Sequence, residues 1–180
     1  VTRLEHCQAR DIAPRMRLFD NAAVPLQAID VPELAQRNIA ALFEEENRGL
    51  VLLAFTDSGN MLTFTYRGEL YVVRHSDVSL PQLQAATGEA RAQLFERIAL
   101  EVQRSLDNFD RLNSQIAISR VLVAPLPGVS GFLDYLRQYL FQPVAELDLA
   151  EVLDLAAIPE LRTPERQAQC LWSIGAALRD

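Results

Sequence analysis

The sequence predicts an α/β fold in which a mixed sheet begins as a three-strand antiparallel meander and continues through crossover helices. Between residues 49 and 75 the apolar pattern is that of extended chain, and two clusters of turn residues divide it into three segments. After residue 79 helical and extended segments alternate, which is typical of crossover units that add parallel strands to a sheet.

Each strand of the meander has its own signal. Residues 50–55 form a nearly continuous apolar run, as expected for a strand that is buried on both faces. Residues 61–66 alternate threonines with apolar side chains, so we expect the threonines to face outward. Turn residues at 57–60 and at 67–68 bound this strand, and the third strand is expected at residues 70–73.

Helices are expected on both sides of the meander. Before it, the sequence predicts a helix at residues 9–23 with Pro14 in its first turn, a short strand at 26–30 and a helix at 33–45. After it, Ser79 and Pro81 mark the entrance of one long helix, whose apolar residues recur every three or four positions. A strand at 116–123, a helix at 129–141, a strand at 143–147 and a final helix at 164–178 follow.

Charge and composition exclude several classes of function. The 180-residue chain carries a net charge of −7, from 17 basic and 24 acidic residues, which argues against binding to nucleic acid or to an anionic lipid surface. All 17 basic residues are arginine, so this segment has neither a phosphate-loop lysine nor a Schiff-base lysine. No apolar run is long enough to span a bilayer, and the two distant cysteines form no metal or disulfide pattern, so we expect a cytoplasmic protein.

Several segments resemble the PilM family of type IV pilus assembly proteins. Residues 118–148, ISRVLVAPLPGVSGFLDYLRQYLFQPVAELD, are similar to the family's terminal strand, loop and helix. Residues 98–112, IALEVQRSLDNFDRL, look like its helix with an E-x-x-R-S-L pattern, and residues 24–43, VPLQAIDVPELAQRNIAALF, look like its strand-Asp-helix segment. The ending GAALR is similar to the family's closing G-x-A-L-R.

This resemblance implies a ribonuclease-H-like lobe of an actin-like ATPase fold at residues 49–180. Residues 1–48 would form an α-β-α segment that leads into the lobe, and a further lobe is expected upstream of Val1. The family role is scaffolding, in which an actin-like body docks on the short cytoplasmic tail of a membrane-anchored partner. We therefore expect inner-membrane pilus assembly proteins as partners, at the cytoplasmic face of the inner membrane, while self-association stays open.

Two nucleotide-contact loops depart from the family pattern. Aligned on the first hairpin, the Asp of the family's Asp-x-Gly-x-x-Thr signature falls on Ala54, its Gly on Thr56 and its Thr on Asn60. The magnesium-holding carboxylate and the glycine that permits close phosphate approach are thereby missing. A later Gly-Gly pair falls on Ala124 and Pro125, and proline lacks an N–H and obstructs a purine. Divergent loops of this kind are similar to the MSHA-pilus branch of the family, the MshI proteins.

The remaining candidates for a nucleotide cleft occupy six positions, Asp57, Ser58, Gly59, Asn60, Gly128 and Ser130. The first four could be a surviving phosphate loop, but a plain hairpin turn is favoured, and Asp57 would repel an anion. Ser130 is expected in the N-cap region of the following helix, whose N-terminus could attract an anion. ATP and Mg²⁺ are expected as cofactors only if this cleft functions, and no catalytic residue or metal ligand is assigned.

Two pairs of charged residues on the long helix each have two interpretations. Glu101 and Arg104 could contact a ligand, but a local ion pair on a solvated face is favoured. Asp107 and Asp110 could face a metal ion, but an exposed acidic face is favoured.

The leading hypothesis is a non-catalytic, actin-like scaffold of MSHA or type IV pilus assembly. The alternatives are an actin-like ATPase of a pilus machine and the cytoplasmic domain of a type II secretion L protein.

Overall fold

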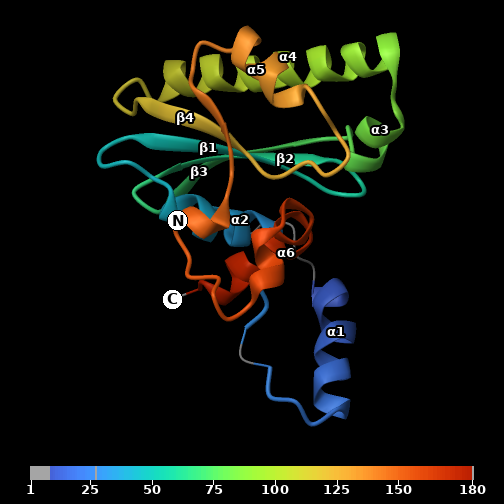
Figure 1. Cartoon of the computed structure of the whole chain (residues 1–180). Helices are drawn as coiled ribbons and strands as arrows, with labels where there is room; N and C mark the ends of the chain where they lie inside the picture. Colours follow the sequence, from blue (N-terminus) through green and yellow to red (C-terminus); the bar gives the residue numbers. More distant parts are fainter. Residues whose placement is uncertain (1–8, 27, 180) are drawn as a thin grey trace. The chain divides into compact units, whose positions relative to one another are not determined.

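The computed structural model describes residues 9–26 and 28–179, which divide into one compact unit that ends at Val31 and another that begins at Pro32 (Figure 1). The first unit contains helix α1 (Ala9–Asn21), which confirms the predicted helix there. Pro14 lies inside α1, not in its first turn as expected. The boundary that we predicted from the sequence separates a leading segment at residues 1–48 from a ribonuclease-H-like lobe at residues 49–180. It stays a prediction.

The strand expected at residues 26–30 is wrong, because Leu26 and residues 28–30 lie in neither strand nor helix, and Gln27 lies outside the described residues. A short extended segment becomes a strand only beside another strand that accepts its hydrogen bonds. The five strands of the sheet all come from residues after Arg48.

The second unit is built around a five-stranded mixed sheet with the order β3-β2-β1-β4-β5. Strands β1 (Gly49–Phe55), β2 (Asn60–Tyr66) and β3 (Glu69–Ser76) pair antiparallel as the predicted meander. Strand β4 (Ile118–Val123) pairs parallel to β1, and β5 (Val144–Glu146) pairs parallel to β4. The predicted α/β fold with a meander and crossover helices is confirmed.

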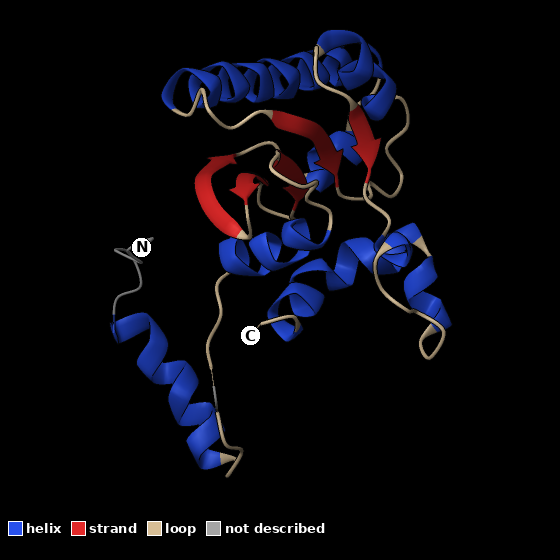
Figure 2. Cartoon of the chain, turned by 90° about the vertical axis from the view of Figure 1, so that its left-hand side faces the viewer, coloured by secondary structure: helices blue, strands red, loops and turns tan. Residues whose placement is uncertain are grey.

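Helices cover both faces of this sheet (Figures 1 and 2). On one face lie α4 (Gly88–Leu112) and α5 (Phe132–Tyr139), and on the other lie α2 (Pro32–Leu42) and α6 (Pro164–Ala177). Two short 3₁₀ helices, η1 (Leu149–Glu151) and η2 (Pro159–Arg162), connect β5 to α6. The two faces therefore carry two separate apolar cores, one against α4 and α5 and one against α2 and α6.

The two-sided cover corrects the prediction for β2. Thr63 and Thr65 were expected to face outward, but both are fully buried under the α2 side of the sheet. The side-chain amide of Gln36 on α2, itself fully buried, donates to Leu52 O at 2.9 Å and to Thr63 Oγ1 at 3.0 Å. Alternation of polar and apolar residues signals outward threonines only where one face of the sheet is exposed to water. Here the buried amide of Gln36 is the hydrogen-bond partner of Thr63, whereas Thr65 Oγ1 is buried without a partner.

The single long helix predicted after residue 79 is two helices, α3 (Leu80–Ala85) and α4. Ser79 is the N-cap of α3, and its side chain and that of Gln82 form a capping box. Gly88 has a φ of +54°, which is incompatible with a continuous right-handed helix, so the chain changes direction before α4. The apolar spacing in α4 is confirmed. The buried residues of this helix, which face the sheet, are Phe95, Ile98, Ala99, Val102, Leu106 and Phe109.

The remaining elements are confirmed with shorter bounds. Strand β4 begins two residues later than predicted, and α5 covers only the centre of the predicted 129–141 helix. The Val129 N–H donates to Leu126 O at 3.1 Å in a turn, so residues 129–131 belong to the loop. Helix α6 buries Gln167, Leu171 and Gly175, whereas Ala168 and Trp172 are only partly buried.

Helices α2 and α6 cross in direct backbone contact. A Cβ atom on Gly175 would lie 2.1 Å from the carbonyl oxygen of Ala35, a distance that real Cβ atoms do not adopt. Beside this contact the Asn38 side-chain amide donates to Gly175 O at 2.8 Å. The crossing thus depends on a residue without a side chain at position 175.

We expect Gly175→Ala to lower the free energy of unfolding by about 1–3 kcal/mol, because the new methyl group forces α2 and α6 apart. Urea unfolding followed by circular dichroism measures this change. Ser173→Ala, at an exposed position of the same helix, is the matched control and should change stability by less than about 0.5 kcal/mol. Equal stability of Gly175→Ala and the wild type would contradict the close crossing.

Candidate functional site in the β1–β2 hairpin and the loop after β4

The hairpin between β1 and β2 is closed by one hydroxyl group. Thr56 Oγ1 accepts hydrogen bonds from the backbone N–H groups of Ser58 at 3.1 Å and Gly59 at 3.0 Å. The Thr56 N–H in turn donates to Gly59 O at 2.7 Å. Backbone N–H groups in such a turn are the donors that would hold a phosphate oxygen. In this chain two of these N–H groups are already bonded to the side chain of Thr56.

The four hairpin candidates divide into two exposed and two buried residues. Asp57 and Ser58 are exposed at the tip of the turn. Gly59 packs against β3, because a Cβ atom at this position would lie 2.2 Å from Ser76 O. Asn60 is 6% exposed, and its side-chain amide donates to Val78 O at 2.9 Å. Gly59 and Asn60 therefore have structural roles that tie the hairpin to β3 and to the chain beyond it.

The loop after β4 is also held from within the chain. The Ala124 N–H donates to Leu53 O at 2.8 Å, so the loop leaves the sheet beside the end of β1. Pro125 is buried, and Gly128 adopts a φ of +77° that favours glycine. Ser130 is exposed and is not the N-cap of α5. That position is held by Gly131 in the left-handed conformation, without a side-chain cap, so the expected serine cap is wrong.

Helix α3 bridges the hairpin and the loop. The Leu80 N–H at its start donates to Thr56 O at 3.0 Å, and the Gln84 side-chain amide near its end donates to Pro127 O at 2.7 Å. The structure thus places both sets of candidate residues at one edge of the sheet, near α3 (Figure 1). One cavity of about 360 Å³ borders the hairpin, another of about 170 Å³ borders the loop, and the two have no lining residue in common.

The cavity beside the hairpin brings together residues that sequence reasoning did not select. It is lined by Glu33 at the start of α2, His75 near the end of β3 and Trp172 on α6. The Glu33 Oε1 and His75 Nε2 atoms lie 3.2 Å apart, and the Trp172 Nε1 atom is buried without a hydrogen-bond partner. No local pattern could have signalled this group, because its members lie 42 and 97 residues apart in sequence.

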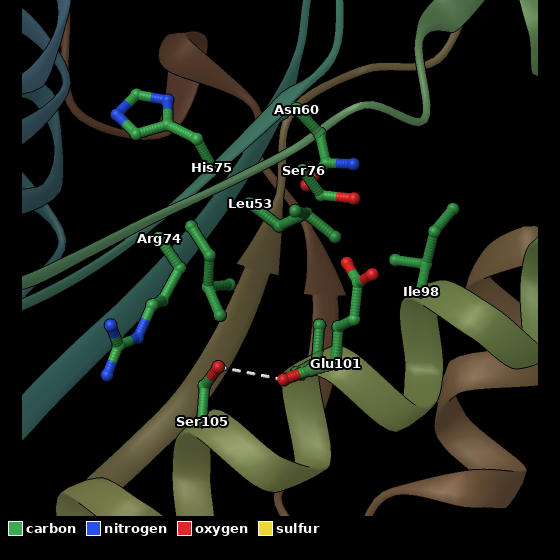
Figure 3. Close-up of a pocket in the computed structure, with 10 residues that line it drawn as sticks. Leu53, Asn60, Arg74, His75, Ser76, Ile98, Glu101 and Ser105 are labelled. Carbon is green, nitrogen blue, oxygen red and sulfur yellow. Dashed lines mark hydrogen bonds between the residues drawn. The ribbon is translucent and has the colours of Figure 1, made fainter.

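Glu101 lies beside a much smaller cavity between α4 and the sheet. Figure 3 shows its side chain pointing toward the Ser76 end of β3, with Ser105 one turn away. The cavity has a volume of about 20 Å³, which suits a single water molecule. The ion pair of Glu101 is formed with Arg97, at 3.4 Å, and not with Arg104 as expected. Both Arg97 at i−4 and Arg104 at i+3 are neighbours of Glu101 on a helix surface, so the spacing in the sequence could not distinguish the two partners.

Two displaced pKa values occur away from the hairpin. Burial raises the pKa of Tyr135 on α5, and a hydrogen bond from Gln167 lowers the pKa of the Asp148 carboxyl group beside η1. Neither residue lines the cavity beside the hairpin or the one beside the loop. These shifts therefore report packing and capping, not an arrangement of acid and base.

The residues present do not fit a magnesium nucleotide. Ala54, onto which the sequence resemblance places a magnesium-holding carboxylate, is fully buried in the sheet and has no ligand atom to offer. The N–H groups of Ser58 and Gly59 are already bonded to Thr56, and the carboxylate of Glu33 faces the same cavity with a charge that repels phosphate. Among residues 9–26 and 28–179 no group of three histidine, cysteine, aspartate or glutamate side chains could hold a metal ion.

Comparison with solved structures shows the fold. The PilM–PilN type IV pilus biogenesis complex contains a chain that matches 93% of this one with a TM-score of 0.70 and 17% sequence identity. The ethanolamine utilization protein EutJ from Carboxydothermus hydrogenoformans matches 97% of the chain with a TM-score of 0.57 and 12% identity. The chain has an actin-like ATPase fold. The predicted fold class is confirmed, and the PilM-like resemblance is supported at the level of fold.

The chain spans about three fifths of the solved structures that it matches, 57% of the PilM–PilN chain and 62% of the EutJ chain. No protein-family model and no curated protein matches the sequence. None of the helices within the described residues is long and apolar enough to cross a membrane.

We expect Thr56→Val to lower the free energy of unfolding by about 1–2 kcal/mol, because it keeps the branched shape but leaves the N–H groups of Ser58 and Gly59 without an acceptor. Thr56→Ser retains the hydroxyl group and is the matched control, with an expected loss below about 0.5 kcal/mol. Thermal and urea unfolding measure both. If valine and serine have the same effect, the hydroxyl group does not close the hairpin.

Proposed function

We propose that this chain is part of a non-catalytic, actin-like scaffold protein in type IV pilus assembly, which binds inner-membrane assembly proteins on the cytoplasmic side. The finer assignment that we propose is the MSHA pilus and an MshI-type protein. The observation that carries the proposal is the hairpin closed by Thr56 within an actin-like fold similar to that of PilM. Such a hairpin retains the fold of a nucleotide-binding lobe without the free donors that phosphate binding needs.

The solved complex supports our proposal that the partner is another pilus assembly protein. The structure with a TM-score of 0.70 is a complex of PilM with a second pilus protein, PilN. A chain that has this fold but cannot bind a nucleotide could still bind another assembly protein, as PilM does in that complex. Because the chain covers 57% of that PilM chain, the docking surface of the family can lie in sequence beyond this segment.

We expect Mg-ATP to show no binding tighter than about 1 mM in calorimetry, with this chain and with the protein extended upstream. The Thr56→Gly variant separates two possible causes of this lack of binding, the absence of free N–H donors and the absence of a carboxylate for magnesium. It frees the N–H groups of Ser58 and Gly59, yet it should still show no magnesium-dependent binding, because Ala54 supplies no carboxylate. A micromolar dissociation constant for the wild type would overturn the scaffold proposal and support the actin-like ATPase alternative.

We expect the full-length protein to co-purify with an inner-membrane pilus assembly protein when the pilus operon is expressed with it. Thr56→Ser, which keeps the hairpin closed, should recover the same partner in the same amount. Recovery of no membrane assembly protein would contradict the partner claim. Recovery of type II secretion components, together with a transmembrane helix encoded after the domain, would support the secretion L protein alternative.

A further inference from the structure

We draw no further inference here: the strongest candidate, the cavity of about 360 Å³ between the β1–β2 hairpin, the start of α2 and α6, belongs to the site already described, where its carboxylate and imidazole groups, Glu33 and His75, are already paired with each other.

Discussion

The burial of β1 on both faces is the constraint on which the rest of the structure depends. Every residue of this strand is buried, and it hydrogen-bonds to β2 on one side and to β4 on the other. A strand with no exposed face and no exposed edge requires helices above and below the sheet and a neighbouring strand on each side. Its second neighbour here, β4, is parallel to it, and a parallel neighbour is reached only through a crossover. The layered arrangement of α4 with α5 and of α2 with α6 follows from that requirement.

Burial on both faces also decides how polar groups are distributed. Thr63 and Thr65 are inside the protein because α2 covers their side of the sheet, and the buried amide of Gln36 joins α2 to β1 and β2. On the same side Gly175 lets α6 approach the backbone of α2. The α2–α6 layer thus has specific hydrogen bonds and a close backbone approach in addition to its apolar core, whereas the core under α4 contains more aromatic rings.

The sequence was sufficient for the fold because its main signals are local. The apolar run of β1, the turn residues of the meander and the helical spacing in α4 each require only neighbouring residues to be interpreted. The errors arose where distant parts decide the outcome. The threonines of β2 are buried by α2, and Leu26 and residues 28–30 form no strand. The break before α4 depends on the backbone conformation of a single glycine, Gly88.

For the candidate site, the structure brings the hairpin and the loop after β4 to one edge of the sheet, but the sequence could not show how Thr56 is used. A threonine in a turn is ordinary, and only its geometry shows that the hydroxyl group occupies the donors of Ser58 and Gly59. The pairing of Glu33 with His75 was invisible for the same reason. A hairpin that is closed by its own side chain keeps one shape whether the cell is rich or poor in ATP. A scaffold built on it would therefore not change conformation with nucleotide binding or hydrolysis. Its assembly would then follow the abundance and affinity of its partners alone, through mass action.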